Sequence, residues 1–414
     1  MKIAVVGAGI GGLAFAVAAR QKGHEVTVLE RRAAFSDEGA GIVLGPNVMA
    51  ALAPLNLAQE IIKAARPVQE MRITDAKGVL LARTRYRSAS LPHSAQAIHR
   101  SRLHHILRDA FDGTLLLNTA VRSVEPGTIH LEEAKITADL IVGADGIRSS
   151  VREALHPGLQ PRYSGTTCWR FVAEGCWSDH VTEMWGVGKR VGVVPLAADQ
   201  TYVFLTLNAP RRAPAPFQTL EEFRQLWAEF KGPARGALDS LDDLAKLLHN
   251  DLEDGLPQTW QKPGVVLIGD AAHAVTPNLG QGAGLAIEDA CCLASLLEQP
   301  RALERYEKLR RPRASWILDR SYSVGKMAQL QAPWLCWLRN KAVSWTPGWV
   351  NQAAMQRIIH DMSGVPVENG TVTAQTRPSL HKAEPLGHLN YLLKERRQPD
   401  TAFLPRKLFQ RRDL

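Results

Sequence analysis

The N-terminal pattern of apolar and polar positions is that of a strand, a helix and a second strand. Residues 2–6 form a short apolar run, which predicts a buried strand. A glycine-rich turn comes next, and an alanine-rich stretch reaching about Lys22 predicts a helix. A second apolar run over 25–29 then ends at Glu30. This order is typical of the first βαβ unit of a parallel sheet.

Further apolar runs downstream predict more strands. Residues 139–142 and 264–268 are expected to be buried strands, and 68–82 to be a β-hairpin that turns at 75–78. The stretch from 165 to 208 is also β-rich and predicts several strands. Helices are expected over 101–110, over 219–230, over 238–249, from about Gly282, and through most of 301–360.

These patterns predict an α/β fold in which a Rossmann-like domain is interrupted by an inserted β-sheet domain. The Rossmann-like domain is discontinuous, because its predicted strands and helices come from three separate parts of the chain. The expected division is 1–66, 100–160 and 262–300 for the Rossmann-like domain, 67–99 and 161–261 for the inserted substrate domain, 301–360 for C-terminal helices, and 361–414 for a basic tail.

Charge is the next feature that bears on function. The chain has 414 residues with 50 Lys or Arg against 41 Asp or Glu, a net charge of +9. This balance favours anionic ligands such as phosphates and carboxylates, but it is too diffuse to predict nucleic-acid binding. About half of the excess, a net +4, lies in 391–414. We interpret this basic tail as solvated, with docking on a membrane surface or a partner as the alternative.

The five cysteines argue against a disulfide framework or a metal site. Their number is odd and no CxxC motif occurs, which fits a reducing compartment and predicts no metal centre. Cys291 and Cys292 stand in an apolar helical stretch and are expected in the core. No run of 18 apolar residues occurs, so no membrane span is expected. With no targeting segment recognised, the expected location is the cytoplasm.

The first motif with a chemical meaning is Gly7-x-Gly9-x-x-Gly12, followed by Glu30. The first glycine allows a tight turn, the second lets the backbone approach a pyrophosphate, and the third permits close packing of helix and strand. The pyrophosphate would rest on the helix N-terminus. A carboxylate at the end of the second strand can accept hydrogen bonds from ribose hydroxyls. The motif therefore predicts binding of NAD or FAD.

The second motif favours a flavin. A predicted strand ends in Gly269-Asp270, and a glycine-rich turn from Pro277 to Gly282 leads directly into a helix. Such a turn presents backbone N–H groups to an anionic ring edge, as a reduced flavin has near N1 and its C2 carbonyl. For Asp270 alone, a helix cap is the alternative interpretation.

These two motifs, with Gly143-Ala144-Asp145-Gly146 between them, resemble those of the group A flavoprotein monooxygenases. This family comprises single-component FAD hydroxylases of the para-hydroxybenzoate, salicylate and urate hydroxylase kind. The resemblance covers about residues 1–360, and the three motifs occur in the family order. The sequence contains no second GxGxxG motif. This agrees with a family that has no separate domain for NAD(P)H.

The resemblance implies a set of residues that contact FAD. In chain order they are Gly7, Gly9, Gly12 and Glu30 at the ADP portion, Gly41 in the 39–42 loop beside the flavin, Arg100, Asp145 and Gly146 in the motif linked to FAD and the pyridine nucleotide, Asp270 at the ribityl or pyrophosphate portion, and Pro277, Gly280, Gln281 and Gly282 along the isoalloxazine.

The β-rich insert is where the resemblance directs the search for a substrate site. Arg190 and Tyr202 stand where urate-hydroxylase-like members place an arginine and a tyrosine near the flavin, and we expect them on antiparallel neighbouring strands. An arginine would orient an anionic or carbonyl-bearing ring, and a tyrosine would donate a hydrogen bond to it. A solvated sheet face is the alternative for both, and Trp169 with Arg170 is the alternative site. We interpret the stripe Trp334, Trp337, Trp345 and Trp349 as helix packing, and His273 as a capping or packing residue.

The function implied by the resemblance is an FAD-dependent monooxygenase. NADH or NADPH would reduce FAD, and molecular oxygen would add at C4a to give a hydroperoxide that hydroxylates or epoxidises a small aromatic or unsaturated ring. Pro277 would lie at the reacting edge. A monomer or homodimer is expected. The alternatives are a related flavin oxidoreductase without oxygen transfer and a flavin-binding regulatory or scaffold protein.

Overall fold

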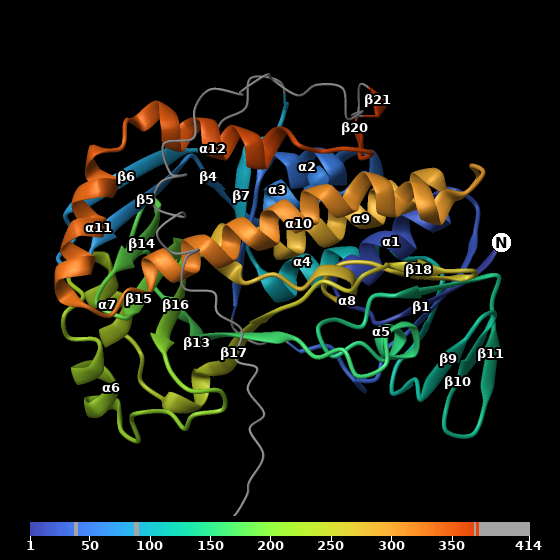
Figure 1. The fold of residues 1–414 in the computed structure, drawn as a ribbon, viewed down its shortest axis with the longest axis horizontal. Helices are drawn as coiled ribbons and strands as arrows, with labels where there is room; N and C mark the ends of the chain where they lie inside the picture. Colours follow the sequence, from blue (N-terminus) through green and yellow to red (C-terminus); the bar gives the residue numbers. More distant parts are fainter. Residues whose placement is uncertain (37–39, 87–90, 368–369, 372–414) are drawn as a thin grey trace, which may run out of the picture. The chain divides into compact units, whose positions relative to one another are not determined.

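The computed structural model describes residues 1–36, 40–86, 91–367 and 370–371 (Figure 1). A six-stranded sheet gathers strands that are far apart in sequence, as the sequence pattern predicts. All its neighbouring strands run parallel except for the β18–β19 pair at one edge. In sheet order the strands are β18 (Gln261–Lys262), β19 (Val265–Leu267), β12 (Leu140–Gly143), β1 (Lys2–Val6), β2 (Glu25–Leu29) and β8 (Thr114–Leu116).

Helices α1 (Ile10–Gln21) and α9 (Gly282–Leu296) pack against each other beside this sheet, and α10 (Ala302–Ala328) packs on α9. Both α1 and α9 are rich in alanine and almost wholly buried, because small side chains let two helices approach closely. Cys291 and Cys292 are buried in this core, as predicted.

A seven-stranded sheet forms most of the β-rich part of the chain. Helices α6 (Leu220–Leu226) and α7 (Pro233–Asp239) lie over one face, where Trp227 and Phe230 join a buried aromatic cluster. Its strands, in sheet order, are β17 (Leu248–Asp254), β13 (Arg162–Glu174), β16 (Gln200–Asn208), β15 (Lys189–Pro195), β14 (Val181–Trp185), β5 (Glu70–Asp75) and β6 (Leu80–Arg85).

A third, antiparallel sheet is built from segments on both sides of the predicted boundary near residue 66. Strand β7 (Ala95–His99) pairs with β3 (Gly41–Leu44) and with β4 (Arg66–Val68), although 67–99 was assigned to the insert. The division into domains therefore stays a prediction. The remaining elements include α2 (Pro46–Leu52), α3 (Ala58–Ala64), α4 (Arg100–Asp109), β9 (Ser123–Glu125), β10 (Thr128–His130), β11 (Lys135–Thr137), α5 (Ser150–Leu155), α8 (Asp270–His273), the 3₁₀ turn η3 (Pro277–Leu279), β20 (Pro366–Val367) and β21 (Gly370–Thr371).

The helix expected over 238–249 is wrong. Helix α7 ends at Asp239, and residues 248–254 instead form strand β17, which pairs antiparallel with β13. The segment 238–249 is rich in leucine and aspartate, and this composition favours a helix only weakly. Pairing along the edge of a long strand supplies backbone hydrogen bonds that outweigh such a preference.

The C-terminal helices form as expected, but their tryptophans do not pack. Helices α11 (Pro333–Trp345) and α12 (Gly348–His360) contact the edge strand β6 (Figure 1). Their four tryptophans are exposed, so the interpretation as helix packing is wrong. The buried face of α11 instead carries Cys336 and Arg339. Within the described ranges, no helix combines the length and apolar character needed to cross a membrane. The predicted basic tail falls almost entirely outside those ranges.

The most unusual packing feature is a buried ion cluster between α9 and α10. Glu288 accepts hydrogen bonds from Arg310 at 2.6 Å and from Arg313 at 2.6 and 2.8 Å, and all three side chains are almost fully buried. Asp289 accepts from Arg310 Nε at 2.9 Å. Asn47 on α2 donates to Glu288 at 2.7 Å. Three helices are thereby joined by charge-assisted hydrogen bonds that no water screens.

We expect Arg310→Met to lower the free energy of unfolding by about 3–5 kcal/mol, because it leaves two buried carboxylates short of a partner. Chemical denaturation measures the difference. Arg305→Met is the matched control, since Arg305 is exposed on the same helix, and it should cost less than about 0.5 kcal/mol. Equal effects of the two substitutions would contradict a stabilising role for the cluster.

Acid should weaken this cluster within a defined range. Burial raises the pKa of Asp289, but the charges of His273 and Arg310 outweigh it and lower the pKa to about 2. Because the folded pKa lies below the unfolded value of about 3.9, the stabilisation from Asp289 is present above about pH 4 and is lost as the pH falls toward 2. Unfolding free energies measured from pH 6 downward should fall less steeply in Asp289→Asn than in the unsubstituted protein. A parallel decline in both would exclude this contribution.

Candidate active site

The N-terminal ends of α1 and α9 meet at one place. A Cβ atom on Gly11, in the first turn of α1, would lie 3.0 Å from Cβ of Ala286 near the start of α9. The first N–H groups of a helix lack intrahelical partners and carry the positive end of its dipole. Two such ends side by side make a strong anion-binding position. It lies just beyond the ends of β1 and β19, as in other parallel sheets that bind nucleotides.

The three motif glycines have three different surroundings. Gly7 has φ +102°, and a Cβ there would lie 2.5 Å from the Ala144 carbonyl oxygen. A Cβ on Gly12 would lie 2.0 Å from the Gly7 carbonyl oxygen, so helix and turn touch. A Cβ on Gly9 would meet nothing within 4 Å. The first and third glycines are therefore needed by the fold itself, whereas the space beside Gly9 is open for a ligand.

Glu30 and His104 fix the shape of this turn. The Glu30 carboxylate accepts hydrogen bonds from the Ala8 N–H at 2.9 Å and from the Arg32 N–H at 3.0 Å. On the other side, His104 Nε2 lies 2.5 Å from the Ala8 carbonyl oxygen. Burial lowers the pKa of His104. Sequence reasoning missed His104, and its spacing within α4 carries no signal that could have identified it.

Asp270 begins α8 and is accessible to solvent, yet the protein around it raises its pKa through desolvation. The positive charges of His273, Arg100 and Arg152 act in the opposite direction, which places Arg100 in the same electrostatic neighbourhood. Arg152 donates to the Ala271 carbonyl at 3.2 Å. Arg152 is a second residue that the motifs did not indicate.

The ion cluster fixes the backbone at Asp270. Asp289 accepts the Gly269 N–H at 3.1 Å and is hydrogen-bonded to His273 Nε2. Gly269 itself has φ +57°, in the left-handed region that favours glycine. His273 is therefore a packing residue, one of the two interpretations given from sequence, and it holds the turn that carries Asp270.

Asp145 is engaged with the protein rather than open to a ligand. Its carboxylate accepts hydrogen bonds from Ser149 Oγ at 2.5 Å and from the Ser150 N–H at 2.6 Å, at the start of α5. Burial raises the pKa of Asp145, and this effect outweighs that of the hydrogen bonds, which lower the pKa. Gly146 follows with φ +78°. The contact of Asp145 and Gly146 with FAD stays a prediction.

The turn from Pro277 to Gly282 lies between α8 and α9. Gly280 has φ +63° and ends η3, and Gln281 is buried and precedes the first turn of α9. Asn47 Nδ2 lies 3.4 Å from Gln281 Oε1. The loop beside Gly41 is described from residue 40 onward, so the predicted Gly39 lies outside the described residues.

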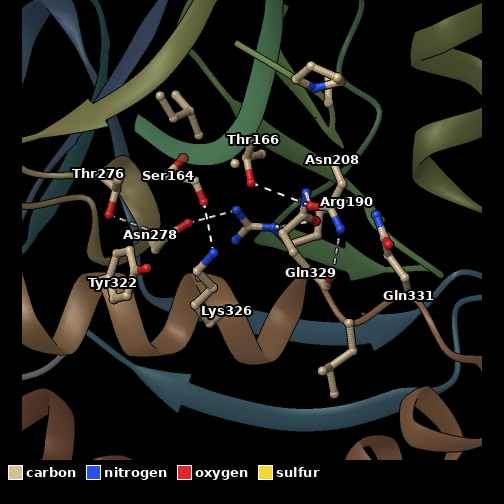
Figure 2. Close-up of a pocket in the computed structure, with 16 residues that line it drawn as sticks. Ser164, Thr166, Arg190, Asn208, Thr276, Asn278, Tyr322, Lys326, Gln329 and Gln331 are labelled. Atoms are coloured by element: carbon tan, nitrogen blue, oxygen red, sulfur yellow. Dashed lines mark hydrogen bonds between the residues drawn. The ribbon is translucent and has the colours of Figure 1, made fainter. Parts of the chain in front are cut away.

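A cavity of about 440 Å³ adjoins this turn, and Figure 2 shows its lining. Its walls come from the ends of β13 and β16, from Thr276 and Asn278, and from α10 with the segment after it. Arg190 and Lys326 are its charged residues, and the described residues that line it include no carboxylate. Lys326 Nζ donates to the Ser164 carbonyl oxygen at 3.1 Å. The cavity thus favours ligands that carry hydrogen-bond acceptors.

Arg190 lies at the inner wall of this cavity, and only 2% of its surface is exposed. Its guanidinium donates to Glu183 at 2.9 Å. It also donates to Asn278 Oδ1 at 2.7 Å and to Gln329 at 3.2 Å (Figure 2). Asn278 also donates to the Ser321 carbonyl at 2.9 Å. These partners hold the Arg190 side chain in one orientation.

Asn278 connects Arg190 to the turn from Pro277 to Gly282, and Gly325 on α10 leaves the space that the Asn278 side chain occupies. A Cβ on Gly325 would lie 2.4 Å from Asn278 Nδ2. Neither residue was singled out from sequence, although Asn278 stands within the quoted Pro277–Gly282 motif.

Tyr202 shares a sheet face with Arg190 but does not meet it. Strands β15 and β16 are antiparallel neighbours, as predicted. In their register Arg190 is opposite Thr206, while Tyr202 is opposite Val194, and the Phe204 ring lies across Gly192 between them. Tyr202 instead contacts Gly41, whose Cβ would lie 2.6 Å from the tyrosine Cβ.

The alternative pair, Trp169 and Arg170, divides between the two faces of the sheet. Trp169 lies in the aromatic cluster under α6 and α7 and stacks on His249. Arg170 is on the same face as Tyr202 and interacts with it, but it does not line the cavity.

FAD fits the position where α1 and α9 meet. The open space at Gly9, the two helix ends and the accessible carboxylates of Glu30 and Asp270 match a ligand with a pyrophosphate between hydroxyl-bearing groups. Over the described ranges, no group of three or more His, Cys, Asp or Glu side chains is placed to hold a metal ion.

Comparisons with known proteins agree with this geometry. A family model described as FAD binding domain matches residues 1–321. The chain is 35% identical to the aurachin C monooxygenase/isomerase of Stigmatella aurantiaca, over 82% of this chain and 93% of that protein. It is 33% identical to the 2-heptyl-3-hydroxy-4(1H)-quinolone synthase of Pseudomonas aeruginosa, over 86% of this chain and 97% of that protein.

A similar fold occurs among solved structures. Klebsiella pneumoniae HpxO complexed with FAD and uric acid superimposes with a TM-score of 0.78 at 24% identity, over 87% of this chain and 97% of that one. At this identity the match shows the fold.

The motif glycines should separate cofactor binding from folding. Gly9→Val should leave the fold intact, because Gly9 has φ −73° and open space at its Cβ, but it should abolish FAD binding by filling the pyrophosphate position. Gly12→Val should instead lower the free energy of unfolding by about 1–3 kcal/mol or more, since its Cβ collides with backbone. FAD content after gel filtration and thermal unfolding measure the two effects. A folded Gly9→Val protein that retains FAD would overturn the assignment.

Proposed function

The chain belongs to the FAD binding domain family, and it is an FAD-dependent monooxygenase that uses NAD(P)H to hydroxylate aromatic substrates. From this premise we propose that its substrate is a 4-quinolone-like ring. Such a ring is a planar N-heteroaromatic with a carbonyl group. The proposal combines two lines of support, the relatives and the cavity.

The names of the relatives support a quinolone. The synthase from Pseudomonas aeruginosa is named for a 3-hydroxylated 4-quinolone with a heptyl chain, and it is matched over nearly its whole length. A relative of lower sequence identity, the 6-hydroxynicotinate 3-monooxygenase of Bordetella bronchiseptica at 28%, is also named for a nitrogen heterocycle. These names describe oxygen insertion, which favours the monooxygenase over a reductase or a scaffold protein.

The cavity beside Arg190 is the observation that carries the proposal. A volume of about 440 Å³ is within the range of sites for small organic ligands. Its two cations and its amide and hydroxyl groups, without a carboxylate among the described lining residues, suit a ring that carries a carbonyl acceptor. They would also stabilise the oxyanion form of that ring, whose electron density makes the adjacent carbon nucleophilic toward oxygen. Leu252 and Leu330 offer apolar surface for an alkyl substituent.

In the proposed arrangement, each group of site residues has one task. Gly7, Gly9, Gly12 and Glu30 would bind the ADP portion of FAD, while Arg100, Asp145, Gly146 and Asp270 would contact its middle and Gly41, Pro277, Gly280, Gln281 and Gly282 its ring. FAD, when bound, supplies the redox chemistry: it takes a hydride from NAD(P)H and delivers one oxygen atom of O₂.

The chain's own contribution is orientation, charge and exclusion of water. The N–H groups at the start of α9 would stabilise negative charge at the nearby ring edge. Arg190, held by Glu183 and Asn278, would present a fixed positive charge toward the substrate carbonyl. Tyr202 packs on Gly41 and would keep water from the space between the flavin loop and the sheet.

The direct test uses purified protein reconstituted with FAD and 2-heptyl-4(1H)-quinolone as the probe. NADH and NADPH are compared, and labelled dioxygen reports oxygen transfer into the product by mass spectrometry. Urate and 6-hydroxynicotinate serve as competing probes. The proposal requires the quinolone to stimulate NAD(P)H oxidation most and to gain one labelled oxygen. Faster, coupled turnover of either competitor would refute the quinolone assignment and leave the monooxygenase assignment in place.

Arg190→Lys should retain FAD but raise the KM for the quinolone about tenfold to a hundredfold, equivalent to losing a charged hydrogen bond of about 1.5–3 kcal/mol. A poorly oriented ring should also raise the ratio of NAD(P)H consumed to product formed. Arg83→Lys is the matched control, because Arg83 is exposed on edge strand β6 of the same sheet and outside the cavity wall, and it should change neither value by more than about twofold. Normal KM and coupling in Arg190→Lys would remove Arg190 from the substrate site.

A further inference from the structure

Helix α11 presents an apolar stripe to solvent. Trp334, Trp337 and Trp345 are 63%, 61% and 78% exposed, and Leu338 is 48% exposed. With Lys341 these residues follow the spacing i, i+3, i+4, i+7 and i+11, which places all five on one helix face. Trp349, 63% exposed, is the second residue of α12 and follows the end of α11 by four positions. We call these six residues the tryptophan stripe.

The stripe is exposed although α11 is firmly attached. On the opposite face, Arg339 is buried and donates hydrogen bonds to the Ala328 carbonyl at 2.8 Å and to the Gly186 carbonyl at 3.3 Å. Its guanidinium also lies over the Trp185 ring. The helix therefore cannot turn its apolar face inward. A fixed, exposed stripe of large apolar side chains marks an interaction surface.

The two helices that carry the stripe contain no acidic residue. Helices α11 and α12 contain Arg339, Lys341 and Arg357, of which Arg339 is buried. Lys341 stands within the stripe itself and is exposed. The sequence thus pairs an aromatic surface with a positive one over two consecutive helices.

We propose that the tryptophan stripe binds the surface of an anionic phospholipid bilayer. Indole rings favour the headgroup layer, where the ring is shielded and its N–H remains hydrated, and lysine pairs with lipid phosphate while its stem stays apolar. At 13 residues, or about 20 Å, α11 would lie along the surface. This inference does not depend on the identity of the substrate.

Charge complementarity favours a bilayer over the two other occupants. A second copy packed stripe against stripe across a two-fold axis would bring Lys341 into an apolar interface near its own mate, with no acid on either stripe to pair with it. The C-terminal segment 391–414 carries a net +4 and would be repelled by the same lysine. An anionic lipid surface alone matches both the indoles and the positive charge.

The experiment uses the full chain loaded with FAD and sedimented with sucrose-filled vesicles. One set contains phosphatidylcholine with 30% phosphatidylglycerol, and the other phosphatidylcholine alone. The protein should pellet with the anionic set, bind at least tenfold more weakly to the neutral set, and release as salt rises. Brominated lipid should quench its tryptophan emission. Absence of sedimentation with anionic vesicles would overturn the proposal.

Substitutions locate the contact. Trp337→Gln combined with Trp345→Gln should weaken vesicle binding at least tenfold and remove most of the bromine quenching, while FAD content and turnover without vesicles stay unchanged. Trp177→Gln is the matched control, since Trp177 is exposed in the loop between β13 and β14 and outside the stripe, and it should bind normally.

Two further results would exclude the stripe as the lipid contact. One is that removal of 375–414 abolishes vesicle binding while the double tryptophan variant still binds. The other is that the double variant converts a dimer to a monomer in gel filtration with no change in sedimentation.

Discussion

The buried ion cluster of Glu288, Asp289, Arg310 and Arg313 is the constraint on which the rest of the site depends. Four charges without water tolerate little displacement, because any loss of geometry leaves a desolvated charge unpaired. The cluster therefore fixes the start of α9 against α10. Through Asp289 it also fixes the Gly269 N–H and the His273 ring, and hence the position of Asp270. The backbone at the proposed cofactor position is therefore set by side chains that lie buried between α9 and α10.

The chemistry of the site follows from that fixed frame. With α9 held, its N-terminus lies beside that of α1, and two sets of free N–H groups point to one place. Neutral, rigid donors of this kind stabilise negative charge without reorganising, which is what a cofactor with a pyrophosphate and a reducible ring requires. On the proposed substrate side Arg190 would supply the complementary positive charge, and its guanidinium is held through Asn278 by the same helix α10.

Sequence reasoning succeeded where chemistry is local and failed where it depends on distant partners. The glycine motif, four strands of the nucleotide-binding sheet and the antiparallel pairing of Arg190's strand with Tyr202's could be predicted, because spacing and hydrophobic period determine them. The ion cluster could not, since Glu288 and Arg313 look like surface charges until α9 and α10 are packed. The helix predicted over 238–249 was extended into the start of strand β17, because the ladder partner of β17 is some 80 residues away. The tryptophans of α11 have core-like spacing, and only the buried Arg339 on the opposite face shows that they point outward.

Gly325 has a consequence for how this enzyme can diversify. Asn278 fills the space that a side chain on Gly325 would take. The contact between Arg190 and the Pro277–Gly282 turn therefore depends on a helix position with no functional group of its own. A methyl group there would displace Asn278 and release Arg190 to a new orientation. Related enzymes could thus acquire a different ring preference through one small residue on α10, with every catalytic side chain unchanged. Substrate specificity in this fold then depends partly on glycine positions in helices that lie outside the sequence motifs. A comparison of motifs alone does not detect such positions.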